Sequence, residues 1–320
     1  MALDVALVGP LNVDLLITGS APADFDALAQ WAGPSNVMLC AAGSAGYLAQ
    51  DLAKLGLQTG IVSTLADDPF GDAIQRIVAE AGVDVSHVSR APETLSGIGI
   101  YMLLFGSKKR PLTYRLPTHA PWPIKFNRAD SDYLLSARHL HCAGYLHFPE
   151  MWTDEMAALF RLAKARGLTT SLDPQFVLFP VDVPWLEPLV DLLKVTDVLL
   201  LDEDEARQIA QSADLAEAAA RLQAAGPAMV VIKRGARGAL IQAADRFFAQ
   251  PAIAVPEEDI VESIGAGDAF DAGFIVGYLA GWPIERIVRF ATAAAASTLR
   301  GSGGTNSLAT RPELERAIAS

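Results

Sequence analysis

Cysteine is scarce in this chain of 320 residues, which contains only Cys40 and Cys142. Two cysteines cannot build a disulfide framework, and we expect both to be small buried hydrophobic residues. Long apolar segments are also missing, since no stretch approaches the roughly 20 apolar residues of a membrane-spanning helix. Residues 1–10 carry Asp4 where a signal peptide would be positively charged. We therefore expect the protein to be cytoplasmic.

Positive charge is in short supply. Lys and Arg together number 25, against 37 Asp and Glu, and the formal net charge is -12. A field of this sign repels nucleic acids and anionic membranes, so we expect neither as a partner. Hydrophobic residues make up 51% of the chain and charged residues 19%, which is typical of a globular protein with a large core.

Two common nucleotide-binding motifs are absent. The chain has no G-x-x-x-x-G-K-[S/T] sequence, which excludes a P-loop enzyme. The first apolar run is followed by the residues GPLNVD at 9–14, which lack the G-x-G-x-x-G of a dinucleotide-binding turn. This argues against a Rossmann dehydrogenase.

Strand-like and helix-like segments alternate along most of the chain. The apolar run at 3–9 predicts a buried strand, and residues 43–55 predict a helix that ends at Gly56. The other predicted strands and helices are 58–65, 69–81, 138–143, 153–166, 168–172, 197–201, 214–225, 229–233, 268–280 and 283–299. Such alternation predicts an α/β fold with a mostly parallel sheet sandwiched by helices.

One region interrupts this alternation. Residues 95–105 and 111–116 are extended runs joined by 106–110, which predicts a hairpin. With residues 11–17 it would form a small β-strand lid on a single domain that spans 1–320. Two strands alone are marginally stable and leave open edges, so such a lid allows a homodimer in which two lids pair.

The stretch from 261 to 274 carries the clearest chemistry. Gly265, Ala266 and Gly267 precede a predicted helix, and small residues let a ligand approach the backbone closely. The first amides of a helix point outward and, with the helix dipole, bind anions. Asp268 lies at the mouth of this anion hole, where a carboxylate could deprotonate a hydroxyl that attacks a phosphoryl group.

A plainer interpretation is that Asp268 and Asp271 are first-turn acids that cap the helix. The glycine-rich run is longer than capping requires, however. An acid beside an anion site repels the anion, which is awkward for a structural role but useful for phosphoryl transfer. We therefore favour phosphoryl transfer.

The run GAGDAFDAGF at 265–274 resembles the C-terminal signature of ribokinase-like (PfkB) carbohydrate kinases. The resemblance extends over essentially the whole chain, because other segments resemble the signatures of this family in the same order. These segments are 9–14, 42–56, 60–71, 172–175, 197–205 and 233–238.

The resemblance implies an enzyme that transfers a phosphoryl group from ATP, with Mg²⁺, to a hydroxymethyl group of a neutral sugar. Asp268 would be the catalytic base, and the anion hole would comprise Gly265, Ala266 and Gly267. The acceptor would contact Asp14, Asn12, Gly43, Tyr47 and Arg115. The nucleotide would contact Asp202, Lys233, Gly235, Gly238 and Thr292. Glu205 would help to order Mg²⁺.

The chain also departs from the family pattern. Tyr47 stands where an Asn commonly contacts a sugar hydroxyl, and Asp202 stands for the usual Asn of an N-x-x-E segment. Glu262 replaces the usual Asp in a region that frames a monovalent-cation site in many members, so a role for K⁺ is left open. Val177 stands where kinases of keto-deoxy acids carry a carboxylate-binding Arg, which favours a neutral acceptor.

Two other functions stay open. Tyr47, Trp122 and Phe148 could stack on a base, as in a nucleoside kinase on the same fold. A protein that binds sugar or nucleotide without turnover is the other alternative, although the GAGD run argues against it. Of the basic residues near the hairpin, we expect Lys108 and Lys109 to be solvated, whereas Arg115 could reach the acceptor.

Overall fold

A nine-stranded sheet lies at the centre of the computed structural model, which describes residues 3–22, 24–28, 35–104, 113–115, 127–178, 180–244 and 246–319. The strands, in spatial order, are β13 (Arg246–Gln250), β12 (Ala239–Ala243), β11 (Met229–Lys233), β10 (Val198–Asp202), β9 (Thr169–Asp173), β8 (His139–Ala143), β1 (Val5–Val8), β4 (Thr59–Ala66) and β5 (Asp84–Ala91). All neighbours from β11 to β5 are parallel, and β12 and β13 extend the sheet antiparallel. The prediction of a mostly parallel sheet is confirmed.

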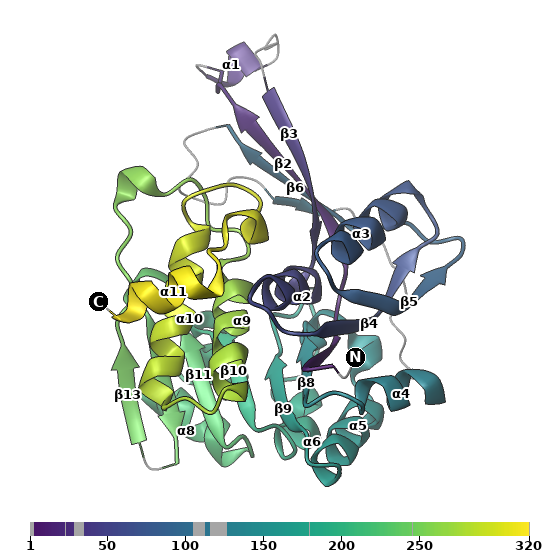
Figure 1. Cartoon of the computed structure of the whole chain (residues 1–320), viewed down its shortest axis with the longest axis vertical. Coiled ribbons are helices and arrows are strands. Elements are labelled where there is room, and N and C mark those ends of the chain that lie inside the picture. The colour runs from purple at the N-terminus through teal and green to yellow at the C-terminus, as the bar shows by residue number, and fades with distance from the viewer. Residues whose placement is uncertain are drawn as a thin grey trace.

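Helices cover both faces of this sheet (Figure 1). One face packs against α2 (Ser44–Lys54), α3 (Pro69–Glu80), α9 (Ala266–Leu279), α10 (Ile284–Thr298) and α11 (Arg311–Ala319). The other face packs against α4 (Arg128–Leu134), α5 (Asp154–Ala165), α6 (Val190–Leu193), α7 (Glu203–Ala210) and α8 (Leu215–Ala224). Because the central strands are buried on both faces, their sequences are continuous apolar runs rather than alternating ones.

A second, smaller sheet stands away from this body at one end of the molecule (Figure 1). Its strands, in order, are β3 (Ser35–Ala42), β2 (Asn12–Gly19), β6 (Ile98–Leu103) and β7 (Thr113–Arg115). The pairs β2–β3 and β6–β7 are antiparallel, and β2–β6 is parallel. The predicted hairpin is confirmed by the pairing of β6 with β7, whereas its connection at 106–110 lies outside the described residues.

Short elements complete the chain. A helical turn, α1 (Phe25–Leu28), lies at the tip of the small sheet. The 3-10 helices are η1 (Tyr145–His147), η2 (Pro149–Met151), η3 (Glu187–Leu189), η4 (Gly235–Arg237), η5 (Glu257–Asp259) and η6 (Gly304–Ser307). Among the described residues, no helix is both long and apolar enough to span a bilayer.

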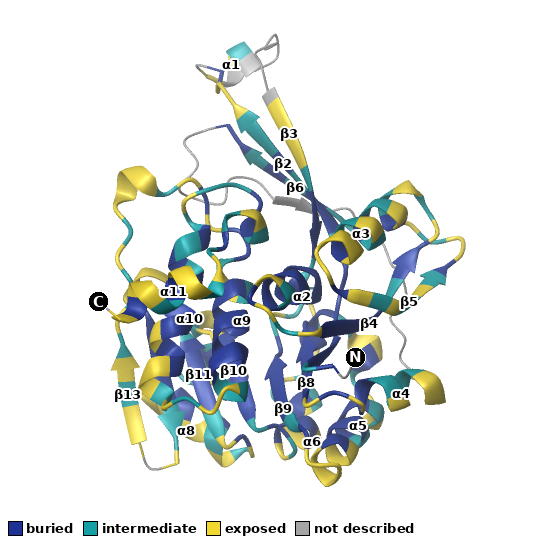
Figure 2. Cartoon of the chain, viewed as in Figure 1, coloured by how far each residue is buried: buried dark blue, intermediate teal, exposed yellow. Residues whose placement is uncertain are grey.

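Helix α9 is buried around most of its circumference, as Figure 2 shows. It lies between the sheet and helices α2 and α10, so its N-terminus is held in place from several sides. The helix begins at Ala266, two residues before the predicted start at Asp268. The glycine-rich run therefore leads directly into the first turn, which is the arrangement that an anion hole requires.

Candidate active site

The carboxyl ends of the parallel strands converge on one edge of the central sheet. Asp173, Asp202 and Lys233 are the last residues of β9, β10 and β11. Asp14 follows β1 after a short turn. Ligands of open parallel sheets bind at this edge, and the structure brings most of the predicted site residues there.

The predicted anion hole lies at the N-terminus of α9. Gly265 is the N-cap residue, with a φ of 74°, a left-handed conformation that favours glycine. A Cβ atom at this position would also lie 3.2 Å from Gly304 Cα. Gly267 is exposed and Asp268 is half-buried in the same turn. The first amides and the Asp268 carboxylate therefore lie together at an accessible helix end.

Lys233 lies beneath this anion hole, and its side chain is largely buried. Its Nζ atom donates to Asp173 Oδ2 at 2.8 Å and to Asp271 Oδ2 at 2.9 Å. A Cβ atom on Gly267 would lie 3.9 Å from the same Nζ atom. Burial alone would lower the pKa of Lys233, but the two carboxylates outweigh it and raise this pKa well above its usual value. The ammonium group is therefore a permanent positive charge below the first turn of α9.

The pKa values of the two carboxyl groups around Lys233 are shifted in opposite directions. Burial, and then the negative charge of Asp173, hold the pKa of Asp271 well above its usual value. Burial also opposes the ionisation of Asp173, but the charge of Lys233 and a hydrogen bond from Asp271 bring the pKa of Asp173 below normal. Asp173 is therefore the more acidic of the two carboxyl groups that contact Lys233.

Glu205 and Asp202 form a reciprocal cap at the start of α7. Asp202 accepts from the Glu205 amide at 2.8 Å, and Glu205 Oε2 accepts from the Asp202 amide at 2.7 Å. Burial, and then the charges of Asp173 and Asp202, raise the pKa of Glu205 to about 8. Among the described residues, no three His, Cys, Asp or Glu side chains are grouped to hold a metal ion by themselves.

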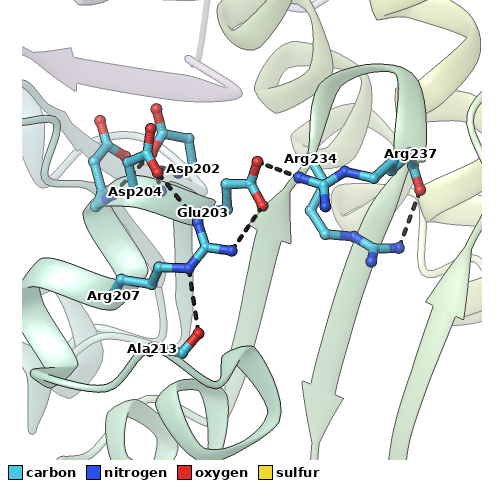
Figure 3. Close-up of polar contacts among 8 residues, drawn as sticks. Asp202, Glu203, Asp204, Arg207, Ala213, Arg234 and Arg237 are labelled. Atoms are coloured by element: carbon cyan, nitrogen blue, oxygen red, sulfur yellow. Dashed lines mark hydrogen bonds and ion pairs between the residues drawn. The ribbon is translucent and has the colours of Figure 1, made fainter.

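The turn between β11 and β12 contains the two predicted glycines. Gly235 and Gly238 have φ values of 54° and 81°, and a Cβ atom on Gly238 would lie 1.9 Å from Gln250 O. The turn is joined to α7 because Arg237 contacts Glu203, which also pairs with Arg207 at 3.2 Å (Figure 3).

Among the residues predicted to contact the nucleotide, Thr292 has a hydroxyl group that bonds within its own helix. It is buried in α10, and its hydroxyl donates to Arg289 O at 2.8 Å. The hydroxyl is therefore engaged within its own helix.

On the other side of the anion hole, the predicted acceptor residues make direct contacts. Asp14 is 4% exposed. Its Oδ2 atom accepts from Tyr47 Oη at 3.0 Å, and its Oδ1 atom accepts from Asn12 Nδ2 at 3.0 Å. Burial, and then the charge of Asp14, raise the pKa of Tyr47 well above normal, so the phenol remains the donor. Tyr47 therefore occupies one of the two carboxylate oxygens of Asp14.

Gly43 and Tyr47 join this acceptor side to the anion hole. Gly43 is the N-cap of α2, where a Cβ atom would lie 2.3 Å from Pro10 O. A Cβ atom on Gly265 would lie 3.6 Å from Tyr47 Cδ1. The aromatic ring thus lies against the first glycine of the anion hole.

The remaining predicted residues are less informative. Arg115 ends β7 and pairs with Gly99, which places its backbone in the small sheet, but its side chain is not described. Lys108, Lys109, Arg110 and Trp122 lie outside the described residues. Phe148 follows η1 and packs against the main core as a half-buried side chain.

Three acidic residues of the site were not among the catalytic or binding residues assigned from the sequence. Asp173 and Asp271 hold Lys233, and Glu262 is buried beside the anion hole. The sequence signal for Asp173 was its place in the segment at 172–175. No signal in the sequence indicated that Asp271 would meet a lysine of a distant strand.

The histidines of β8 have a different role. Both are fully buried and share one face of the strand, where Ser171 Oγ lies 2.7 Å from His139 Nε2 and 2.6 Å from His141 Nδ1. Burial lowers the pKa of His139 to about 4 and that of His141 to about 3. These neutral side chains form a buried polar row beneath α9, next to Tyr278.

Comparisons with known proteins give consistent results. A family model described as pfkB family carbohydrate kinase matches residues 13–311. An ATP-dependent ribose-1-phosphate kinase of Halopiger xanaduensis is 28% identical over 263 residues, which are 82% of this chain and 81% of the relative. A cytidine kinase of Thermococcus kodakarensis is 24% identical over 302 residues, which are 94% and 98% of the two chains. A solved structure of Arabidopsis thaliana ribokinase with ribose and ATP covers 100% of both chains, with a TM-score of 0.78 and 22% identity.

Proposed function

The chain belongs to the pfkB family of carbohydrate kinases, and we propose that it transfers the γ-phosphoryl group of ATP to a hydroxymethyl group of a neutral sugar. The observation that carries this proposal is the position of Asp268. It is half-buried in the first turn of α9, where a Cβ atom on Gly265 would lie 3.6 Å from Tyr47 Cδ1 and one on Gly267 would lie 3.9 Å from Lys233 Nζ. This helix end therefore lies near both the proposed acceptor side and the proposed nucleotide side.

Asp268 is the proposed base. It would orient the acceptor hydroxyl and accept its proton as the oxygen attacks the phosphorus atom. A helix N-terminus favours the ionised carboxylate, which makes Asp268 a weak base. In a loose transition state the hydroxyl becomes acidic only as bonding advances, so position matters more than basicity. The amides of Gly265, Ala266 and Gly267 would stabilise the charge that develops on the phosphoryl oxygens.

The nucleotide is proposed to lie over the carboxyl ends of β10 and β11. The turn with Gly235 and Gly238 and the cap residue Asp202 would line this site, and Lys233 supplies fixed positive charge below the phosphates. Thr292 is retained as a proposed contact only through its nonpolar atoms. The ATP complex of the Arabidopsis ribokinase supports the choice of nucleotide.

Mg²⁺ fits the oxygen-rich surroundings of the proposed phosphate site. This ion keeps several waters and is commonly held by one or two carboxylates plus substrate phosphates, so no preformed protein cage is needed. Glu205 would hold it, either directly or through a water, and the ion would offset the charge of the phosphates. The raised pKa of Glu205 means that binding would release a proton from this carboxyl group.

The acceptor is proposed to contact Asp14, Asn12, Gly43, Tyr47 and, from the small sheet, Arg115. A neutral sugar is favoured because Val177 stands at the position of a carboxylate-binding arginine. A nucleoside is the second candidate, since the Tyr47 ring at the anion hole offers a flat face and one relative is a cytidine kinase.

A product screen tests the function. The purified chain is incubated with ATP and Mg²⁺ and, separately, with ribose, fructose, 2-deoxyribose, cytidine and adenosine, and phosphorylated products are detected by mass spectrometry. A phosphorylated sugar is the expected result, and a phosphorylated nucleoside alone would favour the second candidate. Ligand-dependent stabilisation without any ATP-dependent product would instead support a binding protein.

A further inference from the structure

Glu262 is a buried acid whose carboxylate is surrounded by backbone amides. It is 2% exposed. Its Oε1 atom accepts from the amide of Gly303 at 2.9 Å and from that of Gly304 at 3.4 Å. Its Oε2 atom accepts from the amide of Ile264 at 2.7 Å. Both oxygens are therefore held by N–H donors, one from the segment 262–264 and two from the segment 303–304, which begins 41 residues after Glu262.

The receiving segment is shaped for an anion. Gly303 and Gly304 have φ values of 88° and 54°, so both take the left-handed conformation. Consecutive amides in such turns converge and form a concave site for a negative group. The Glu262 carboxylate fills this site from within the chain.

The same turn forms part of the wall of the active site. A Cβ atom on Gly265 would lie 3.2 Å from Gly304 Cα, and one on Gly304 would lie 3.1 Å from Tyr47 Cε1. On its outer side, Lys54 Nζ donates to the carbonyls of Thr305 and Asn306 at 2.8 and 3.0 Å. The position of Gly303 and Gly304 therefore sets the boundary of both the anion hole and the acceptor side.

The donor set around Glu262 does not fit a monovalent cation. Such an ion needs oxygen atoms whose lone pairs point at it. Here the groups from 303–304 that face the carboxylate are N–H donors, and the two carboxylate oxygens direct lone pairs to three amides. A cation placed between these segments would meet positive amide hydrogens.

We propose that Glu262 is a positioning residue that holds the Gly303–Gly304 turn against the anion hole, and that this chain needs no monovalent cation for activity. An aspartate, shorter by one methylene group, would reach these amides less well. The longer glutamate thus supplies, by hydrogen bonds alone, the connection between the two loops. The inference rests on the proposed kinase function, since it concerns the geometry of that site.

The first experiment varies the cation. The rate with a confirmed acceptor is measured in KCl, NaCl and tetramethylammonium chloride at one ionic strength, beside the thermal unfolding temperature in each salt. We expect rates that agree within about twofold and equal unfolding temperatures, as no ion binds only to the native state. Activation by K⁺ of about tenfold or more, or a K⁺-specific rise in the unfolding temperature, would overturn the proposal.

The second experiment tests the positioning role through Glu262→Gln. The amide keeps the size of the side chain, but its NH₂ group must face a backbone N–H. We therefore expect the Gly303–Gly304 turn to shift. We expect kcat to fall about tenfold or more, since small misplacements at a reacting centre are costly, while the KM for ATP changes less than about threefold. Glu258→Gln is the control, because it makes the same chemical change at a nearby residue that is exposed.

The outcomes separate this inference from the proposed function. If the wild-type chain yields no phosphorylated product with any acceptor, the kinase proposal fails. The unfolding temperatures in the three salts then still show whether a monovalent cation binds to the folded chain. If product forms but Glu262→Gln, folded by circular dichroism, keeps its kcat, the positioning role is wrong. Should that variant fail to fold, the wild-type rates in the three salts decide the proposal.

Discussion

At the scale of single residues, the contact between Asp14 and Tyr47 is proposed to shape the acceptor site. Asp14→Ala removes the carboxylate that the phenol and Asn12 hold in place. We expect the acceptor KM to rise strongly and the ATP KM to stay nearly unchanged, because Asp14 lies on the acceptor side only. Steady-state kinetics with each substrate varied in turn measure both constants. An equal rise in the two would contradict the assignment.

A second prediction at this scale concerns Asp51 and the free energy of unfolding. It is fully buried in α2, and neither carboxylate oxygen has a hydrogen-bond partner of normal geometry among the described residues. Burial holds its pKa well above the usual value, although the neighbouring Thr305 hydroxyl lowers it in part. The unfolded chain therefore loses this proton at lower pH than the folded chain, and stability falls as pH rises toward the folded pKa.

Asp51→Asn removes this titration without changing the shape of the side chain. We expect its free energy of unfolding to exceed that of the wild type by an amount that grows with pH, by up to about 1.4 kcal/mol per pH unit. Urea unfolding at pH 5, 6, 7 and 8 measures the difference. The exposed Asp259→Asn is the control. A difference that does not change with pH would show that Asp51 is not a buried neutral acid.

How far the site follows from sequence is clearest at this scale. Asp268 and the glycines before it lie within one short segment, so local pattern alone predicted an acid at a helix N-terminus, and the structure places them so. The Lys233 contacts could not be foreseen, because Asp173 and Asp271 come from a different strand and from the interior of α9. The amide contacts of Glu262 depend on a turn about 40 residues later in the chain.

At the scale of elements, the small sheet is proposed to close over the acceptor. Its strands stand away from the body, and excluding water from the reaction requires closure. We expect hydrogen exchange in β6 to slow when a confirmed acceptor is added, because closure protects its amides. Exchange in β10, at the centre of the main sheet, serves as the internal reference. Unchanged exchange in β6 at saturating acceptor would argue against a lid.

Four strands of the described residues were not predicted from the sequence. β3 belongs to the small sheet, where it was missed because its apolar residues have no clear period. β5 lies at one edge of the main sheet, and its mixture of exposed and half-buried residues lacks the apolar run of a central strand. β12 and β13 extend the opposite edge antiparallel, which the alternation of strand and helix does not indicate. The central strands were predictable because burial on both faces imposes a strong pattern.

At the scale of the whole molecule, the small sheet is proposed to pair two chains. β3 forms one of the two edges of this sheet in the described residues, with Val37 and Met38 exposed by 60% and 37%. An exposed apolar edge strand favours pairing with another chain. We expect a dimer at micromolar concentration by light scattering, and a monomer for Val37→Lys. Leu162→Lys, on the exposed side of α5, is the control and should leave the mass unchanged. A monomeric wild type would contradict the pairing.

The account as a whole depends on Asp268 as the base that activates the acceptor hydroxyl. The most direct test is steady-state kinetics of Asp268→Asn with a confirmed acceptor, beside ATP titration by calorimetry and with Asp259→Asn as the control. The amide keeps the shape of the side chain but cannot accept the proton, so we predict a fall in kcat of about 10²–10⁴. ATP affinity should be kept or slightly improved, because a negative charge near the phosphates is removed. If Asp268→Asn kept more than about a tenth of the wild-type kcat, a loss below the usual range for a base, Asp268 would not be the base.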